Sequence, residues 1–113
     1  MEKVNVTYDR ENDVLFLYKN VRPKGSIELG DFILSFTEGM KATGIEILNA
    51  SKRLSQIFDV KLTKENLANT VKANFRTGYE ADCVYVFFTV VWKHQQTEQK
   101  GSSMIPVPQA IRA

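Results

Sequence analysis

Between residues 4 and 8, apolar and polar side chains alternate, which is the pattern of a β-strand with one buried face. A polar run over residues 9–13 separates this segment from Val14–Tyr18, which is apolar on both faces. Polar residues of this kind favour a turn. Two strands joined by five polar residues predict a β-hairpin at the start of the chain.

Two more strands are predicted before residue 50. Residues 32–37 alternate in hydrophobicity, and residues 43–48 place Ile45 and Ile47 on one face. The segment 38–41 between them is typical of a turn, and Pro23 with Gly25 indicates an earlier bend. The first half of the chain therefore predicts four strands.

The pattern changes to helical spacing after residue 50. Ser51 stands where a helix N-cap is expected, and apolar residues follow it at intervals that build one buried helix face. Thr63 is a second candidate N-cap, with Leu62 and Leu67 in the two positions of a hydrophobic staple. We expect one helix after Ser51 and a short one over about residues 64–69.

The last part of the chain returns to strand patterns. Residues 71–75 alternate, Gly78 is expected to start a turn, and residues 83–94 form the longest strand candidate. Its even-numbered face is apolar up to Trp92, and its odd-numbered face is mixed. The polar stretch 95–103 is expected to be a loop. A last strand over residues 103–107 should lie at a sheet edge because prolines follow and interrupt it.

These elements predict an α+β fold in a single domain over residues 1–113. It is a mostly antiparallel β-meander, with one or two short helices between a four-stranded N-terminal part and a C-terminal hairpin. The composition, with 43% hydrophobic and 25% charged residues among 113, is that of a globular domain with its own core.

The compartment is predicted from what the chain lacks. No stretch approaches the roughly 20 apolar residues that span a bilayer, and the N-terminus has no signal-peptide core. Cys83 is the only cysteine, so no internal disulfide can form. We expect a cytoplasmic protein without membrane contact.

Part of the chain resembles a known family. The segments Val6–Asp9 and Asp13–Leu17, and above all Gly44–Ser51 (GIEILNAS) with the helix after it, are similar to domain-of-unknown-function family 2283. The resemblance covers about residues 4–58 and leaves residues 59–113 outside. Asn49 stands where an Asp is common in the family.

The resemblance implies a small prokaryotic protein with a β-meander followed by a helix. It implies no catalytic residue, because the family has none assigned. Some members are similar to antitoxins encoded beside small toxin-like proteins, so an antitoxin-like partner role is one alternative function.

No residue pattern indicates catalysis, a cofactor or a metal. His94 is the only histidine, and Cys83 lies eleven residues away on the opposite face of the same predicted strand. The carboxylates of residues 9–13 lack the glycine and the distal glutamate of a calcium loop, so a solvated turn is expected. No common nucleotide or hydrolase motif is present. We therefore predict a protein that is not an enzyme.

Charge is uneven along the chain. Residues 1–50 carry six Lys/Arg and eight Asp/Glu, whereas residues 51–113 carry nine and five. Basic residues interleaved with aromatic ones on strands can bind single-stranded nucleic acid. The candidate contacts for this alternative are Lys72, Arg76 and Lys93, although such residues also line ordinary solvent-facing strands.

The predicted strands carry more apolar surface than two short helices can cover. The second apolar face of residues 14–18 and 83–92 must therefore meet another sheet layer of the same chain or another subunit. We predict a homo-oligomer, most simply a symmetric dimer, with Tyr85, Phe87 and Val91 as candidate interface residues. The predicted function is a non-enzymatic protein-interaction or assembly module.

Overall fold

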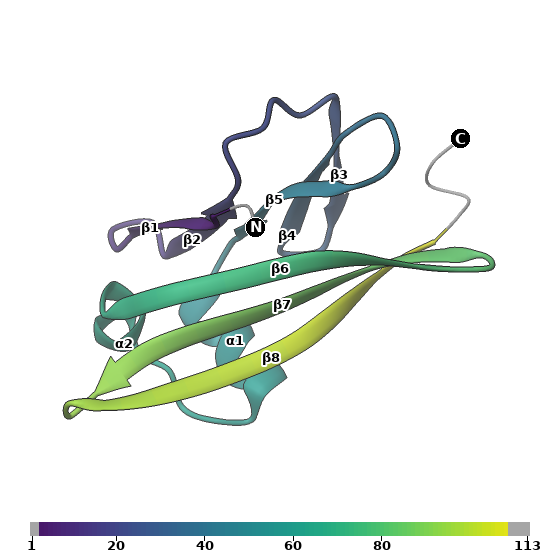
Figure 1. Ribbon diagram of the computed structural model, residues 1–113. Helices are drawn as coiled ribbons and strands as arrows, with labels where there is room; N and C mark the ends of the chain where they lie inside the picture. The colour runs from purple at the N-terminus through teal and green to yellow at the C-terminus, as the bar shows by residue number, and fades with distance from the viewer. Residues whose placement is uncertain (1–2, 109–113) are drawn as a thin grey trace.

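The computed structural model describes residues 3–108, which form two antiparallel sheets and two helices (Figure 1). The first half of the chain builds a five-stranded sheet and helix α1 (Ala50–Phe58), and the second half builds helix α2 (Lys64–Ala68) and a three-stranded sheet. The remaining bounds are β1 Asn5–Asp9, β2 Val14–Tyr18, β3 Gly25–Leu29, β4 Phe32–Phe36, β5 Ala42–Ile47, β6 Thr70–Glu80, β7 Cys83–His94 and β8 Thr97–Pro108. The α+β class predicted from the sequence is confirmed.

The five-stranded sheet has the order β1-β2-β5-β4-β3. The predicted hairpin is present, with Asn5 paired to Tyr18 and Asp9 to Val14. The sequence prediction of four strands missed β3, which pairs with β4 around a turn at Gly30, whose φ is +61°. Pro23 and Gly25 predict a bend in this region. The pairing partner, and not local propensity, makes it a strand.

Helix α1 begins differently from the prediction. Its N-cap is Asn49, in a left-handed conformation and without a side-chain cap, whereas Ser51 lies inside the helix. The carboxylate of Asp13 takes over the capping role, because the backbone N–H and the hydroxyl of Ser51 both donate to it, the latter at 2.7 Å. The expected N-cap was wrong because a distant carboxylate serves the free amides of the first turn.

Helix α2 confirms its predicted start. The Thr63 side chain accepts from the backbone N–H of Asn66, and the Asn66 side chain accepts from the backbone N–H of Thr63, which is a capping box. Leu62 and Leu67, the two staple residues, are both buried. A helix of five residues has little stability of its own, so these contacts hold it in place.

The three-stranded sheet has the order β6-β7-β8 and is longer than the hairpin that we predicted. Gly78 does not start a turn but lies inside β6, where the Phe87 ring covers it. The expected loop after residue 94 is a tight turn at Gln95 and Gln96, both with positive φ, and β8 begins at Thr97. The edge position predicted for the last strand is confirmed, because β8 ends the order β6-β7-β8 and, among the described strands, pairs only with β7. Because only one face of this strand is buried, its sequence contains many polar residues, and these residues made it resemble a loop.

The core lies between the two sheets and the helices. The even-numbered residues of β7 from Val84 to Trp92 are all buried, and they share one cluster with residues of β2, β4 and β5. Phe58 at the end of α1 joins this cluster through Trp92, with ring centroids 6.1 Å apart and planes 8° from parallel. The apolar excess was expected to meet either a second sheet layer of the same chain or another subunit. For these inner faces, the second sheet layer of the same chain provides the cover.

Candidate binding surface

The three-stranded sheet turns one face to the core and the other to solvent, and this outer face holds both predicted sets of site residues. The odd-numbered residues of β7 lie on it, and the register places Arg76 and Met104 beside Phe87, and Lys72 and Lys100 beside Val91. The candidate interface residues and the candidate nucleic-acid contacts, which belong to alternative predicted functions, therefore share one face.

One end of this face is apolar. Tyr85 and Phe87 are half-buried with ring centroids 6.3 Å apart, and Met104 of β8 is 45% exposed beside Phe87. Gly78 makes room for Phe87, because a Cβ there would lie 2.8 Å from a ring carbon. We call this surface the outer patch, and it comprises Tyr85, Phe87, Met104 and Pro106.

The outer patch is bordered by charges of both signs. The Arg76 guanidinium lies 4.2 Å from the centroid of the Phe87 ring, a cation–π contact that covers part of the ring. Glu80, on the same face of β6, is opposite Cys83 in the register. The charge at Cys83, then burial, raises the pKa of the Tyr85 hydroxyl, with Glu80 adding to the effect. Tyr85 is therefore a neutral hydrogen-bond donor at neutral pH.

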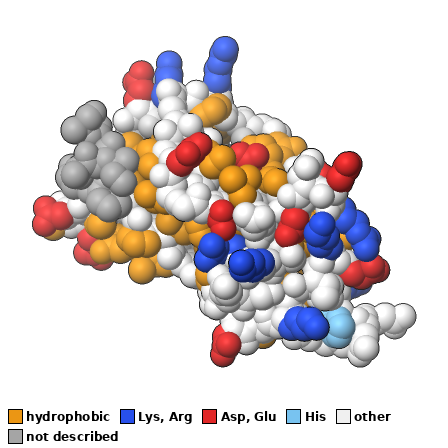
Figure 2. All heavy atoms as spheres, turned by 180° about the vertical axis from the view of Figure 1, so that it is seen from behind, with side chains coloured by type: hydrophobic (Ala, Val, Ile, Leu, Met, Phe, Trp, Pro, Cys, Tyr) orange, Lys and Arg blue, Asp and Glu red, His pale blue; other side chains and the backbone are white. Residues whose placement is uncertain are grey.

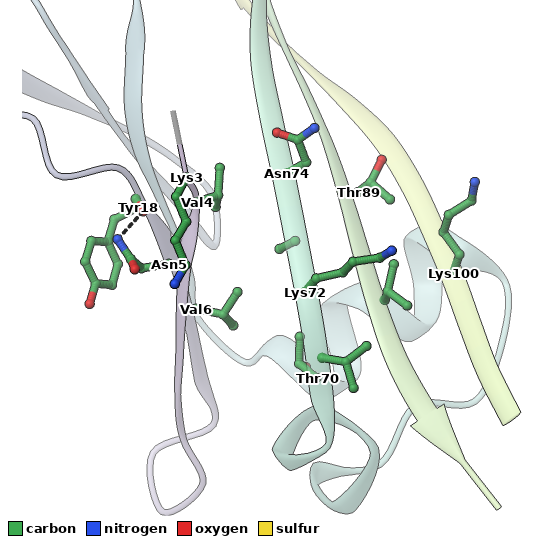
Figure 3. A pocket seen from close by; sticks show the side chains of 13 residues that line it. Lys3, Val4, Asn5, Val6, Tyr18, Thr70, Lys72, Asn74, Thr89 and Lys100 are labelled. Atoms are coloured by element: carbon green, nitrogen blue, oxygen red, sulfur yellow. Dashed lines mark hydrogen bonds between the residues drawn. The ribbon is translucent and has the colours of Figure 1, made fainter. Parts of the chain in front are cut away.

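The other end of the outer face borders a groove between β1 and β6, the facing edge strands of the two sheets. Its volume is about 840 Å³. Figure 3 shows Lys3 and Val6 on the β1 side, with Lys72 extending across β7 toward Thr89 and Lys100. We call it the lysine groove. Its lining is apolar at Val4, Val6, Val71, Ala73 and Val91, basic at Lys3, Lys72 and Lys100, and otherwise polar at Asn5, Tyr18, Thr70, Asn74 and Thr89.

The structure separates the predicted residues into different settings. Tyr85 and Phe87 lie in the outer patch, whereas Val91 is only 6% exposed and lies in the lysine groove. Lys72 lines the groove, Arg76 covers Phe87, and Lys93 is opposite Glu98 in the register. Sequence analysis missed two of the three lysines of the groove, Lys3 and Lys100.

Lys100 and Lys3 could not be assigned to a site from the sequence. Lys100 stood in a segment expected to be a loop, and only the register with β7 places it beside Val91. Lys3 precedes β1, which reaches β6 only through the packing of the two sheets. The signal in the sequence for Lys100 is the Gln95–Gln96 pair, because a two-residue turn there places the following residues on a strand paired with β7.

The carboxylates of the first turn have structural partners. Asp9 accepts from the backbone and side chain of Asn12, and Asp13 accepts from Ser51 and, at 2.7 Å, from the Tyr8 hydroxyl. Burial opposes the charge on Asp13, but the bonds from Ser51 and Tyr8 outweigh it and lower the pKa of this carboxyl. Across residues 3–108, no group of three or more His, Cys, Asp or Glu is placed to hold a metal ion.

Cys83 and His94 lie at opposite ends of β7, as the sequence spacing predicted. His94 contacts the buried Asn66 side chain through its Nδ1 atom, at 3.1 Å, so it braces α2. Within the described part of the chain, neither helix is long and apolar enough to cross a membrane.

The outer face of the five-stranded sheet is a second exposed surface. Phe16, which is 37% exposed, stacks on Tyr18 with centroids 4.8 Å apart, and the Phe16 ring lies beside Gly44. The register places Glu46 between Phe16 and Ile33. Figure 2, which views the molecule from behind, shows hydrophobic side chains interrupted by acidic and basic ones.

Residues 5–51 match a family described as a protein of unknown function, DUF2283, which confirms the resemblance found in the sequence. An uncharacterized protein of Methanocaldococcus jannaschii is 47% identical over 51 residues, 44% of this chain and 44% of that protein. A putative hypoxanthine phosphoribosyltransferase of Methanosarcina mazei is 41% identical over 63 residues, 55% of this chain and 46% of that protein.

The chain thus spans less than half the length of these curated relatives. No solved structure matches the chain significantly. The family match ends at the first turn of α1, so the outer patch lies outside it, and only Asn5, Val6 and Tyr18 of the lysine groove lie within it.

Proposed function

We propose that this protein is a non-enzymatic interaction module that associates with a second copy of itself through the outer patch. The observation that carries the proposal is an apolar surface spread over adjacent strands, with Phe87 and Met104 neighbours in the register and Met104 45% exposed. Contiguous apolar surface of this kind marks contact sites. A prokaryotic, cytoplasmic setting stays part of the prediction.

The charges around the outer patch suit a two-fold symmetric contact. Arg76 and Glu80 lie two positions to either side of Gly78 on the outer face of β6. A two-fold axis across the strands at Gly78 would bring Arg76 of one copy over Glu80 of the other, and the reverse. Such self-complementarity is what an isologous interface requires.

The outer face of the five-stranded sheet is a poorer candidate for self-association. Glu46 lies in the middle of that face, opposite Phe16 on one side and Ile33 on the other. A second copy would have to bury this carboxylate, which is costly without a cationic partner. This difference favours the outer patch.

The proposal that the protein is not an enzyme is supported by the chemistry of the groove lining. Its ionisable side chains are three lysines and one tyrosine, without a carboxylate, thiol or imidazole among the described residues that line it. This set suits binding better than proton transfer. The phosphoribosyltransferase name belongs to a relative that shares only part of its length with this chain. In an antitoxin-like role, a surface such as the outer patch would bind a different protein instead of a second copy of this chain.

Light scattering after size exclusion tests the proposal. We expect a dimer at micromolar concentration, and a monomer for Phe87→Asp, because the substitution places a charge at the centre of the contact. Phe16→Asp is the matched control on the other sheet and should remain dimeric. A monomeric wild-type protein, or a dimer broken by Phe16→Asp instead, would contradict the proposal.

The symmetry of the contact has its own test. Arg76→Glu and Glu80→Arg should each weaken the dimer, since each puts two like charges opposite one another. The double exchange should restore association, because opposite charges face each other again. Failure of the double exchange to restore the dimer would show that these residues do not meet across a two-fold axis.

A further inference from the structure

We infer that the lysine groove binds single-stranded nucleic acid. This goes beyond the proposed function, and it rests on a different part of the molecule from the outer patch. The groove combines three lysines with an apolar floor and amide and hydroxyl side chains, within about 840 Å³. These are the groups that phosphates, base faces and base edges need.

The charge of the groove points to a polyanion. Lys72 and Lys100 flank Val91 on neighbouring strands, so their Cα atoms lie about 10 Å apart, two strand spacings across the sheet. Lys3 adds a third cation from the opposite wall. The described lining residues include no carboxylate, and a ligand with several phosphates would supply the missing countercharge.

The floor of the groove points to a single strand and not to a duplex. Val4 and Val6 come from β1, and Val71, 45% exposed at a β-bulge, comes from β6. Such side chains can contact the flat faces of unpaired bases. A duplex keeps these faces stacked inside, so it could use the lysines but not the floor.

Hydrogen-bonding groups border this floor. Asn74 and Thr89 are opposite each other in the register, and the Thr89 hydroxyl also contacts that of Ser102 at 2.9 Å. Asn5 lies on the β1 wall, with its amide nitrogen 3.4 Å from the Tyr18 carbonyl. In Figure 3, Asn74 and Lys72 extend from the same strand, so a base edge and a phosphate could be held side by side.

Fluorescence anisotropy with labelled oligonucleotides of about 12 residues, within the usual site sizes, tests the inference. We expect single-stranded DNA or RNA to bind. The affinity should fall with a log–log salt slope of about −2, since each of three phosphate contacts contributes about −0.7. A fourfold rise in salt should then weaken binding roughly 20-fold.

The variant Lys72→Gln/Lys100→Gln should reduce the salt slope to about −0.7, because only Lys3 then remains. Glutamine keeps part of the stem that covers Val91, so the fold should persist, and thermal unfolding checks this. Lys24→Gln is the control for loss of a lysine outside the groove, compared with each single substitution. It lies next to β3, at the other edge of the five-stranded sheet, and its side chain is 66% exposed. It should keep the wild-type slope.

Three results would overturn the inference: no anisotropy change at low salt, equal affinity for a duplex or for polyglutamate, or an unchanged slope in the double variant. The oligomeric state of each sample is measured in parallel. A monomer that binds the oligonucleotide would contradict the proposed dimer and keep this inference. A dimer that does not bind the oligonucleotide would contradict this inference and keep the proposed dimer.

Discussion

Phe87 and Phe88 are neighbours in the sequence with opposite structural roles. Phe88 is 2% exposed and packs against Phe58 and Phe32 in the core, with ring centroids 6.1 Å away in each case. Phe87 lies on the outer face, half-buried under Arg76. Both faces of β7 therefore carry a large aromatic side chain, but the two side chains have different partners. Hydrophobicity indicated which residues need cover, and the packing of the sheets decided which of them received it within the chain.

The largest expected effect separates these two residues. Phe88→Ala should lower the free energy of unfolding by about 3–5 kcal/mol, because it removes a buried ring and leaves a cavity. Phe87→Ala should cost about 1 kcal/mol, since solvent already reaches the ring and the site can relax. Urea denaturation of both variants, under conditions where the protein is monomeric, measures the difference. Equal losses of stability in the two variants would show that Phe87 is as fully buried as Phe88.

Glycines provide a second comparison of the faces. A Cβ at Gly101 would collide with the half-buried Phe58 ring, which packs against Trp92 and Phe88, so Gly101→Ala should cost about 1–3 kcal/mol through overpacking. A Cβ at Gly78 would meet the Phe87 ring, which can move toward solvent. Alanine is also the better strand residue, so Gly78→Ala should change stability by less than about 1 kcal/mol. Thermal unfolding of the pair tests this ranking, and a larger loss for Gly78→Ala would reverse it.

The next largest effect on the free energy of unfolding is expected at Asp13, which lies outside both faces of β7. Of the effects predicted here, this one depends on pH. Asp13→Asn should cost about 1 kcal/mol at neutral pH, because Ser51 and Tyr8 lose a charged acceptor that solvent partly screens. The pKa of Asp13 is lowered from 3.8 in the folded state. Its contribution is therefore present above about pH 4 and is lost as the pH falls through the folded value.

Denaturation curves between about pH 2 and 7 check this prediction. The wild-type protein should lose stability toward low pH, and Asp13→Asn should lose less over the same range, since it has no carboxylate to protonate there. Asp82→Asn, in the turn between β6 and β7, is the charge-matched control and should follow the wild-type curve. Parallel curves for the wild type and Asp13→Asn would rule out this role for Asp13.

The smallest effect on stability is expected on the outer face itself. Lys72→Gln and Lys100→Gln should each change the free energy of unfolding by no more than about 0.5 kcal/mol, because both side chains are exposed. The same variants are expected to weaken oligonucleotide binding. Chemical denaturation beside the anisotropy assay would show whether function and stability separate on this face. A loss above about 1 kcal/mol would instead identify these lysine stems as cover for Val91.

Much of the local structure could be predicted because its causes are local. The β1–β2 hairpin follows from alternation around a polar turn, and α2 follows from the Thr63 cap and the leucines around it. The errors have two other causes. The start of α1 depends on Asp13, which is 38 positions from Ser51 in the sequence. The β3 strand and the first half of β8 are polar segments that become strands by pairing with β4 and β7 across the turns at Gly30 and at Gln95–Gln96. Alternation of apolar and polar residues within one segment shows neither kind of partner.

The candidate site shows the same division. Sequence analysis proposed Lys72 for nucleic acid and Tyr85 and Phe87 for an interface, because charge and hydrophobicity are properties of single residues. It could not group Lys72 with Lys3 and Lys100, which are brought together by the register of β8 and by the approach of β1 to β6. It proposed Val91 for the same interface, and the structure places this residue in the groove lining, 6% exposed.

The sequence by itself determined the strand and helix character of most segments, the α+β class and the excess of apolar strand surface, since these depend on spacing between near neighbours. The tertiary structure alone decided that the excess is divided between a shared core and one outer face, and that lysines from three distant segments border one groove. The physical reason is that sheet pairing and sheet packing join residues whose separation along the chain carries no signal of their contact.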